Sequence, residues 1–383
     1  MKRLLLLGAS GSIGSQTIDL LINKKVDYEL VGLSVGKNIE FLDKVLPLFK
    51  SVKYVYVIDS KVAKTLQNLN KNIKFYSEED GFEPLILDSK PDLVVNALVG
   101  FVGVIPSIIT IKNNIDLALA NKESLVVAGD LIQSELKTSK SNLIPIDSEH
   151  VAIDKCLQHV KKEDVKNLIL TCSGGPFRNK TKEELQNVTK ADALNHPTWK
   201  MGNKITIDSA TLINKVFEII EAHYLFNYDF KDIKVLIHPE SQVHSMIELN
   251  NGDRLLDYGP NDMRIPIFYA LSYRSNISLG MDEYLKNAAK LHFFAPNEFQ
   301  NEVLNIAKFV LDRKGNTGCI LNAANDFLVG KFLNEEIKFL DIYKYINLAL
   351  RNIEYIKNPN LQDIISTNNI VQYYLHTAIK EDK

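Results

Sequence analysis

The sequence predicts an α/β fold in three parts: a doubly wound parallel sheet, a central α+β part with a mixed sheet, and a C-terminal α-helical bundle. Three observations predict this order. An apolar run at 2–7 leads into a glycine-rich turn and a helical pattern. Further apolar runs alternate with helical patterns as far as residue 146, which is the order that builds a parallel sheet. From residue 302 onward, helical patterns follow one another with short polar connections.

Length and composition favour a globular protein of two or three domains. The chain has 383 residues, 45% of them hydrophobic and 24% charged, and is too long for one ordinary core. A formal net charge of -2 gives no basic footprint for nucleic acid, and no apolar segment is long enough to span a membrane. Three widely spaced cysteines and a very short N-terminal apolar run favour a reduced, cytoplasmic protein over a secreted one.

The first strand is predicted at Lys2–Leu7, a continuous apolar run typical of a central parallel strand. Gly8, Gly11 and Gly14 follow it, and 15–23 has helical spacing. This order suits a dinucleotide pyrophosphate, because backbone N–H groups at the helix N-terminus face the phosphates. A purely structural turn is the alternative. We predict a Rossmann-like nucleotide-binding domain.

The end of the second predicted strand, 28–34, indicates which dinucleotide is bound. NAD sites usually carry an Asp or Glu about 20 residues after the glycines, where it holds a ribose hydroxyl. This chain has Gly36, Lys37 and Asn38 there instead. A cation and an amide suit a 2′-phosphate, so the sequence favours NADP, with a solvated turn lysine as the alternative.

Later strands of the same sheet end in polar clusters. These strands are predicted at 53–58, 92–98, 115–120 and 143–146. The clusters are Asn121-Lys122-Glu123 and Asp147-Ser148-Glu149-His150. Ligands of open α/β sheets bind outside the carboxyl ends of strands, so both clusters are well placed. If the chain is still extended from Asp147 to Glu149, the two carboxylates point the same way and repel unless a cation or a proton lies between them. Oxygen ligands favour Mg²⁺ or Mn²⁺ over Zn²⁺, and a solvated strand end is the alternative.

The central part combines a mixed sheet with a long polar excursion. Its strands are predicted at 168–172, 233–238 and 243–249, with one sheet face available to another layer or subunit. A tight turn at 173–177 exposes backbone N–H groups that can bind an anion. The stretch 173–203 carries Trp199 and Met201 near its end and is either a surface loop or a lid over a site.

The segment Lys204–Tyr224 is predicted to form a short strand, a turn and an amphipathic helix that Ser209 caps. Asn214 and Glu218 lie one turn apart and share a face, and Lys215 lies between them. A buried amide, ammonium and carboxylate are costly unless each meets a partner, a metal or a ligand. The rest of the chain must therefore supply that ligand.

The C-terminal bundle has predicted helices at 302–313, 317–333, 340–353 and 369–380. Its second helix carries Asn322, Asn325 and Asp326, which capping or packing explains as readily as function. The predicted domains are a nucleotide-binding domain at 1–147, a catalytic and dimerisation domain at 148–274, a linker at 275–299 and a helical bundle at 300–383.

Nine motifs, in one order along nearly the whole chain, resemble the 1-deoxy-D-xylulose 5-phosphate reductoisomerase family. They are GASGSIG at 8–14, GKN at 36–38, ANKES at 120–124, PIDSEH at 145–150, SGGPF at 173–177, HPTWKMG at 196–202, DSATLINK at 208–215 with Glu218, HPESQVHSM at 238–246 and LNAAND at 321–326. The resemblance implies an NADPH-dependent homodimer that rearranges and reduces a small phosphosugar, 1-deoxy-D-xylulose 5-phosphate, to 2-C-methyl-D-erythritol 4-phosphate on the non-mevalonate isoprenoid route.

The resemblance also implies a role for each matching residue. The cofactor would contact Ser10, Gly11, Ser12, Ile13, Gly36, Lys37, Asn38, Asn121, Glu123 and Gly202. One Mg²⁺ or Mn²⁺ ion would be held by Asp147, Glu149 and Glu218. The substrate would be bound by Lys122, Ser148, Glu149, Ser173, His196, Ser209, Asn214, Lys215 and Glu218. The catalytic residues would be Lys122, Asp147, Glu149, His196 and Glu218, beneath a lid that carries Trp199 and Met201.

Two other functions are compatible with a nucleotide domain followed by a second domain. An NADP-dependent semialdehyde dehydrogenase needs an activated cysteine, and Cys172, just before the turn at 173–177, is the candidate. A non-catalytic NADP-binding module would leave the acidic side chains as structural groups. Resistance to thiol alkylation would argue against the first, and metal-dependent consumption of a sugar phosphate would argue against the second.

Overall fold

The structure is a computed structural model that describes residues 1–78, 81–199, 201–274 and 290–382. Within these residues the chain divides into two compact units. Unit 1 comprises 1–124, 131–148 and 262–274, and unit 2 comprises 125–130, 149–261 and 290–382. Most of the predicted linker, at 275–289, lies outside the described residues. In the described part of the chain, no helix has the length and apolar character needed to cross a membrane.

Unit 1 is built on a parallel sheet of seven strands in the order β4-β3-β2-β1-β5-β6-β7, which confirms the predicted doubly wound fold. The strands are β1 Lys2–Leu7, β2 Tyr28–Val35, β3 Tyr54–Val57, β4 Lys74–Tyr76, β5 Leu93–Asn96, β6 Asp116–Leu119 and β7 Leu143–Pro145. The strand β4 was not predicted. It has only three residues at the sheet edge, so it leaves no apolar run in the sequence.

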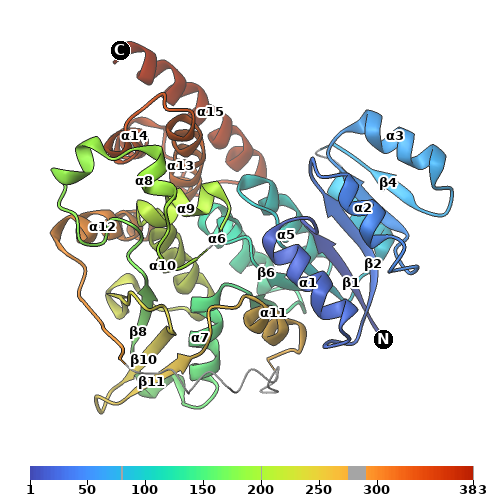
Figure 1. Ribbon diagram of the computed structural model, residues 1–383, viewed down its shortest axis with the longest axis horizontal. Helices are drawn as coiled ribbons and strands as arrows, with labels where there is room; N and C mark the ends of the chain where they lie inside the picture. The colour runs from blue at the N-terminus through green and yellow to red at the C-terminus, as the bar shows by residue number, and fades with distance from the viewer. Residues whose placement is uncertain (79–80, 200, 275–289, 383) are drawn as a thin grey trace. The chain divides into compact units, whose positions relative to one another are not determined.

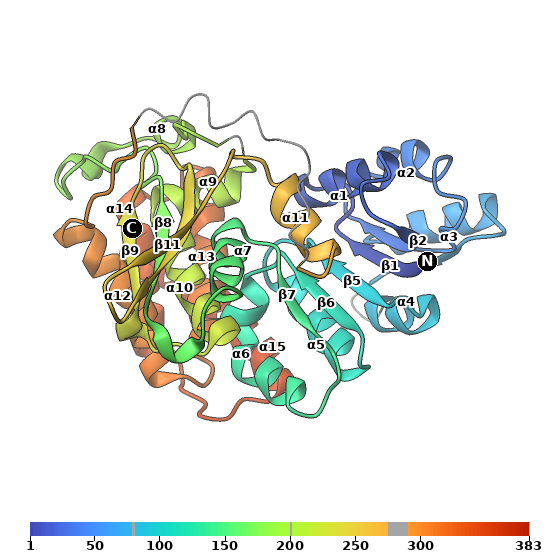
Figure 2. The same ribbon diagram turned by 90° about the horizontal axis from the view of Figure 1, so that it is seen from below.

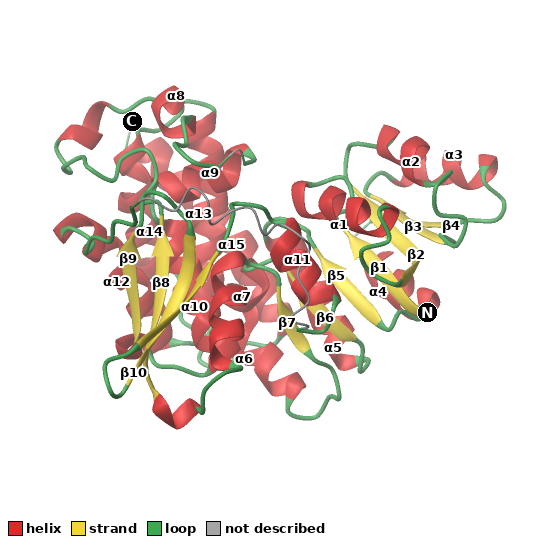
Figure 3. Ribbon diagram, turned by 60° about the horizontal axis from the view of Figure 1, so that its bottom comes forward, coloured by secondary structure: helices red, strands yellow, loops and turns green. Residues whose placement is uncertain are grey.

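Helices cover both faces of this sheet. Those assigned wholly or partly to unit 1 are α1 Ser12–Ile22, α2 Glu40–Val45, α3 Ser60–Leu69, α4 Phe82–Ser89, α5 Val104–Lys112, α6 Glu123–Leu136 and α11 Arg264–Leu271. Figure 3 shows α1, α2 and α3 on one face of the sheet, with α4 and α5 on the other. The late helix α11 packs through Ile267 and Leu271 into the cluster that also contains Ile18 of α1. Right-handed crossovers explain the two faces, because the chain moves outward from β1 in both directions.

Unit 2 contains a mixed sheet of four strands in the order β11-β10-β8-β9, of which β8, β9 and β11 are labelled in Figure 2. The strands are β8 Val165–Cys172, β9 Ile233–Ile237, β10 Val243–Leu249 and β11 Arg254–Tyr258. Only β8 and β9 pair in parallel, as expected for a mixed sheet. The strand β11 was not predicted, because its sequence RLLDY places just two leucines between charged groups.

The helices of unit 2 pack on one face of that sheet and on each other. They are α7 Ser148–Leu157, α8 Lys190–Leu194, α9 Asn203–Ala210, α10 Ile213–Phe226, α12 Glu298–Arg313, α13 Thr317–Leu333, α14 Phe339–Asn352 and α15 Leu361–Glu381. Short 3₁₀ turns lie in unit 2 at Lys162–Asp164, Glu184–Asn187 and Phe230–Asp232, and in unit 1 at Phe101–Gly103. The predicted C-terminal helices are all present, in orange and red in Figure 1. The last one begins earlier than predicted because Asn360 and Asp363 form a capping box there.

The strand predicted at Lys204 is wrong. That segment is the helix α9, whose Ile207 and Ala210 are buried in the core cluster of unit 2. Alternating polar and β-branched residues gave the false strand signal. Ser209 is also not the cap of the next helix, since α10 follows Leu212, which has a φ of 59°.

Replacing Gly14 tests the glycine turn of unit 1. A Cβ at this position would lie 2.3 Å from the carbonyl oxygen of Gly8, so Gly14→Ala should destabilise the fold by about 1–3 kcal/mol. Gly36→Ala is the matched control in the same unit, because nothing lies within 4 Å of its added Cβ. Thermal unfolding of the cofactor-free protein should show a lower midpoint for Gly14→Ala alone. Equal midpoints for both variants would contradict the packing described.

Candidate active site

The turn between β1 and α1 is tightly built. Gly8 has a φ of 82°, and an added Cβ would lie 2.5 Å from the carbonyl oxygen of Ala97, so only glycine fits. The Gly8 N–H donates to the hydroxyl of Ser34, and the Ala9 N–H donates to the Ser34 carbonyl, both over short distances of 2.7 and 2.8 Å. These bonds tie the turn to the end of β2. Gly11 then caps α1, leaving the helix N-terminus available to an anion.

The predicted cofactor residues of unit 1 gather at the carboxyl edge of the parallel sheet. Ser10, Gly11, Ser12 and Ile13 form the turn and the first residues of α1. Gly36, Lys37 and Asn38 follow the neighbouring strand β2 and are exposed. Because β1 and β2 are adjacent and parallel, the two groups leave the sheet at the same edge. Gly202 belongs to unit 2, where it precedes α9.

Asn121 and Glu123, predicted on the nicotinamide side, shape the loop that follows β5. The Asn121 amide donates to the carbonyls of Leu98 and Gly100, each at 3.0 Å. The Glu123 carboxylate accepts the Gly100 N–H at 3.1 Å. Both side chains are almost fully buried. They therefore fix the backbone of this loop, a support role that sequence reasoning did not identify.

Three carboxylates meet at the start of α7. Asp147 directly precedes this helix, Glu149 lies in its first turn and Glu218 comes from α10. One oxygen of each carboxylate lies within 4.8 Å of the others. The chain is not extended from Asp147 to Glu149, because the helix has already begun at Ser148. The helical turn nevertheless brings the two carboxylates together.

Two lysines contact the same carboxylates. Lys122 forms an ion pair with Asp147. Lys215, only 2% exposed, forms an ion pair with Glu218, lies 3.3 Å from a Glu149 oxygen, and donates to the Thr171 carbonyl at 2.6 Å. Burial by itself lowers the pKa of Lys215, but the Glu149 and Glu218 carboxylates raise it by more, so the net pKa is raised and the side chain stays charged.

The donor set fits a hard divalent cation. All three acidic groups offer carboxylate oxygens, which Mg²⁺ and Mn²⁺ prefer, and one oxygen of each lies within 4.8 Å of the others. Asn214 supports this arrangement by donating from its amide to Glu218, as expected for residues one turn apart on a helix.

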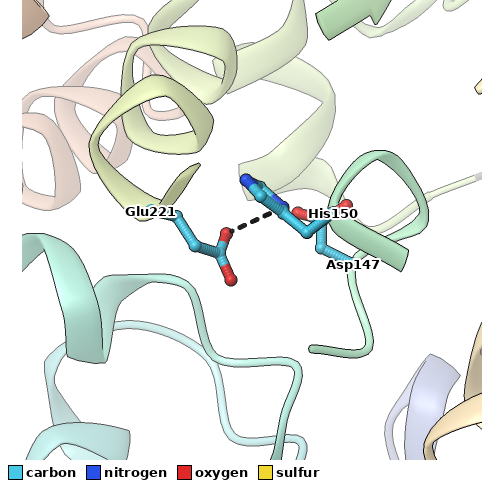
Figure 4. Close-up of side chains that lie close together, drawn as sticks. All are labelled: Asp147, His150 and Glu221. Carbon is cyan, nitrogen blue, oxygen red and sulfur yellow. Dashed lines mark ion pairs between the residues drawn. The ribbon is translucent and has the colours of Figure 1, made fainter. Parts of the chain in front are cut away.

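His150 and Glu221 extend this acidic cluster. Figure 4 shows the His150 ring from α7 pointing toward the Glu221 carboxylate of α10, with 3.4 Å between Nδ1 and Oε2. The other ring nitrogen lies 2.9 Å from the Glu218 carbonyl. Because a carbonyl only accepts, Nε2 carries a proton. The pair thus links the helices that present Glu149 and Glu218, and one Asp147 oxygen lies close enough to make a second potential ligand group. Glu221 was missed because its spacing from Glu218 also suits a core-facing helix position.

Ser173, His196 and Ser209 form a second polar group within unit 2. The His196 Nε2 atom lies 3.2 Å from the Ser173 hydroxyl and 3.1 Å from the Ser209 hydroxyl. The backbone N–H groups of Thr198 and Trp199 donate to His196 Nδ1 at 3.2 and 2.9 Å. Nδ1 is therefore an acceptor, and the proton of the neutral ring is on Nε2. Burial lowers the pKa of His196, which favours this neutral form.

The turn after β8 lies against the end of α9. Gly174 and Gly175 have φ values of 77° and 65°, and the Gly175 N–H donates to the Ser173 hydroxyl at 3.2 Å. A Cβ on Gly175 would lie 2.8 Å from the Ser209 carbonyl oxygen. Glycine therefore allows the turn to approach Ser209 closely. Trp199 and Met201, the predicted lid residues, follow His196 in the sequence and are half-buried. Lys200, between them, lies outside the described residues.

These features define a class: a dinucleotide-binding protein that combines a Rossmann-like sheet with a carboxylate site suited to a divalent cation. Three family models match the chain. They describe the 1-deoxy-D-xylulose 5-phosphate reductoisomerase at residues 4–129, its C-terminal domain at 143–226, and the DXP reductoisomerase C-terminal domain at 258–374. The chain belongs to the 1-deoxy-D-xylulose 5-phosphate reductoisomerase family.

Named relatives align with this chain over nearly its whole length. The 1-deoxy-D-xylulose 5-phosphate reductoisomerase of Clostridium acetobutylicum is 42% identical, with 99% of this chain and 100% of that protein covered. The one from Listeria innocua is 38% identical over 99% and 100%. A solved DOX-P reductoisomerase in complex with NADPH, fosmidomycin and magnesium is 31% identical, has a TM-score of 0.92, and covers 99% of this chain and 98% of its own. The Zymomonas mobilis enzyme with NADPH is 30% identical, with a TM-score of 0.90 and 99% of each chain covered.

Cys172 does not have the environment of an activated nucleophile. Burial raises the pKa of its thiol to about 11, so the thiolate is scarce at neutral pH. We expect Cys172→Ala to keep steady-state activity within about threefold, because the thiol has no part in the chemistry. The control is Cys156→Ala, whose thiol is buried and has a pKa raised to about 12. Loss of activity in Cys172→Ala but not in Cys156→Ala would instead support a catalytic cysteine, which a semialdehyde dehydrogenase requires.

Proposed function

We propose that this protein catalyses the NADPH- and divalent-metal-dependent rearrangement and reduction of 1-deoxy-D-xylulose 5-phosphate to 2-C-methyl-D-erythritol 4-phosphate. The observation that carries the proposal is the cluster of Asp147, Glu149 and Glu218 oxygens within 4.8 Å, in a chain that belongs to the reductoisomerase family. Membership of this family explains why three acidic side chains and two lysines gather near the start of α7. Solved relatives were obtained with NADPH and magnesium, the two groups that this chemistry requires.

The nucleotide would be held by the carboxyl edge of the unit 1 sheet. The turn Ser10–Ile13 and the N-terminus of α1 would bind the pyrophosphate through backbone N–H groups. Lys37 would place its cation near the 2′-phosphate, which makes NADPH the preferred cofactor. NADPH supplies the hydride that reduces the rearranged aldehyde. The tight loop held by Asn121 and Glu123 would then support the nicotinamide side.

The metal would be held by Asp147, Glu149 and Glu218, with Mg²⁺ or Mn²⁺ as the ion. When bound, it acts as a Lewis acid toward the adjacent carbonyl and hydroxyl oxygens of the substrate. Lys122 forms an ion pair with Asp147, so its ammonium would lie close enough to the metal-bound sugar to donate to a hydroxyl. Ser148, the first residue of α7, would contact the sugar from the same place. These side chains would orient the sugar, and closure of the site would exclude water.

The phosphate of the substrate would be bound by Ser173, Ser209, Asn214 and Lys215. Ser173 and Ser209 already share His196, and a phosphate could replace this contact with shorter, charge-assisted hydrogen bonds. The phosphate is remote from the reacting carbons, so its binding energy can drive closure of the lid at 173–203, which carries Trp199 and Met201.

Glu218→Gln tests the metal site directly. The variant keeps the size of the side chain but removes one of the three carboxylates, so turnover should fall at least about 100-fold and metal affinity should fall with it. NADPH absorbance is followed with 1-deoxy-D-xylulose 5-phosphate, with and without a chelator, and Mn²⁺ affinity is measured by calorimetry. Glu248→Gln is the control, since Glu248 accepts from Asn167 on the mixed sheet. Near-normal turnover of Glu218→Gln, or NADPH consumption that ignores the chelator, would contradict the proposal.

A homodimer and a cytoplasmic location complete the proposal. One face of the mixed sheet packs on the main core, and the other carries the apolar cluster of Ile169, Val243 and Met246. Leu256 pairs with Met246 across the strands, so it lies on that second face, and it is 47% exposed. A second copy of the chain would cover this face. The three cysteines are unpaired, in keeping with a reducing compartment.

Leu256→Asp should weaken the proposed dimer, because it places a charge on the apolar face. Sedimentation velocity at micromolar protein should give a dimer for the wild type and a shift toward monomer for the variant. Leu69→Asp, at a 75% exposed position on α3, should leave the dimer unchanged. A wild type that sediments as a monomer would refute the dimer without affecting the chemistry.

A further inference from the structure

The polar groups on α13 of the C-terminal bundle have no part in the function proposed above. Asn322 and Asn325 are fully buried, although an amide inside a helical bundle is costly unless it is bonded. Asp326 follows them and is partly exposed. The contacts of Asn325 and Asp326 show which part of the structure these side chains hold in place.

Asn325 and Asp326 contact α9, the helix that ends with Ser209 and Ala210. The Asn325 amide donates to Asp208 Oδ1 at 2.8 Å. The other Asp208 oxygen lies 2.8 Å from the Lys204 ammonium, and that ammonium lies 3.1 Å from an Asp326 oxygen. Asp208 is only 2% exposed. Each Asp208 oxygen therefore has its own partner: Lys204 on the same helix and Asn325 on α13.

The turn after α9 is fixed to the bundle as well. The Thr211 hydroxyl donates to the Asp208 carbonyl at 3.1 Å, and the Tyr343 hydroxyl of α14 donates to the Thr211 carbonyl at 3.1 Å. The helix α9 is thus held at its carboxylate and at its C-terminal end. Ser209 lies between these two points, and its hydroxyl faces His196.

Such contacts determine the rotation of α9 about its own axis. Successive residues on a helix are about 100° apart, so fixing the direction of Asp208 also fixes the direction of Ser209. A displacement of about 1 Å at a ligand-contacting group is enough to lose much of an oriented interaction. A buried carboxylate between an amide and an ammonium is a costly way to pack a helix, but it defines one orientation.

We propose that Asp208 and Asn325 are positioning residues for the substrate phosphate. Their hydrogen bond, supported by Lys204, holds α9 in the rotation that presents the Ser209 hydroxyl to the phosphate. The C-terminal bundle therefore takes part in substrate binding without contacting the substrate. This inference rests on the proposed function, because it takes Ser209 as a phosphate ligand.

A reciprocal exchange tests the bond. In Asn325→Asp two carboxylates face each other, α9 should shift, and the KM for 1-deoxy-D-xylulose 5-phosphate should rise at least about tenfold while kcat changes less than about threefold. Adding Asp208→Asn restores a complementary pair: the amide now at position 208 donates to the carboxylate now at position 325, and the amide oxygen still accepts from Lys204. The double variant should recover KM to within about threefold of wild type. If N325D does not accumulate as folded protein, Asn325→Ala replaces it, with the same expected change in KM.

Binding of inorganic phosphate, followed by calorimetry, provides a readout that a loss of general stability would not produce. Affinity should fall in N325D, recover in the double variant, and fall also in Ser209→Ala. If N325D lowers kcat and thermal stability but leaves KM and phosphate affinity unchanged, or if the exchange does not restore them, the inference is overturned. If Ser209→Ala itself has no effect, the proposed phosphate site fails and the inference fails with it. An effect of Ser209→Ala without an effect of N325D removes the inference alone.

Discussion

The structure depends on the burial of the Lys215 ammonium between carboxylates. A charge that is 2% exposed is stable only if its partners compensate the lost hydration, and here they come from three elements: Glu149 on α7, Glu218 on α10 and the Thr171 carbonyl on β8. Removing any of these partners leaves a buried charge less well compensated. These contacts therefore hold the sheet and two helices of unit 2 in one arrangement, and that arrangement brings together two of the carboxylates that we propose as metal ligands.

The supporting contacts act on the same helices. His150 bonds to the Glu218 carbonyl and faces Glu221, so α7 and α10 are joined by a second set of contacts besides those of Lys215. Near the C-terminal end of α9, Asp208 and Asn325 connect the proposed phosphate ligand Ser209 to the bundle. In both cases a buried polar contact fixes the direction of a neighbouring side chain to which we assign a function.

Much of the fold could be predicted from the sequence, because strong local patterns determine it. The leucines of β1, the glycines after it and the helical periods of α13 each have one plausible structure. The failures have physical causes. The segment at Lys204 alternates like a strand, but tertiary packing of Ile207 and Ala210 makes it a helix. The return of α11 to unit 1 depends on contacts distant in sequence, which no local pattern reports.

The same distinction applies to the site. Motifs identified Asp147, Glu149 and Glu218, but the sequence did not show that Lys215 would join them, because its contact with Glu149 spans two distant segments. The hydrogen-bond roles of His196 followed only from the backbone donors that surround its ring.

The most direct test of the central claim is anomalous X-ray diffraction from crystals soaked in Mn²⁺. The account predicts one strong Mn²⁺ peak per chain, at about 2.1–2.3 Å from an oxygen of each of Asp147, Glu149 and Glu218, with the Lys215 ammonium still beside these carboxylates. A peak bound to only one of the three, or their side chains turned to separate surfaces, would contradict it.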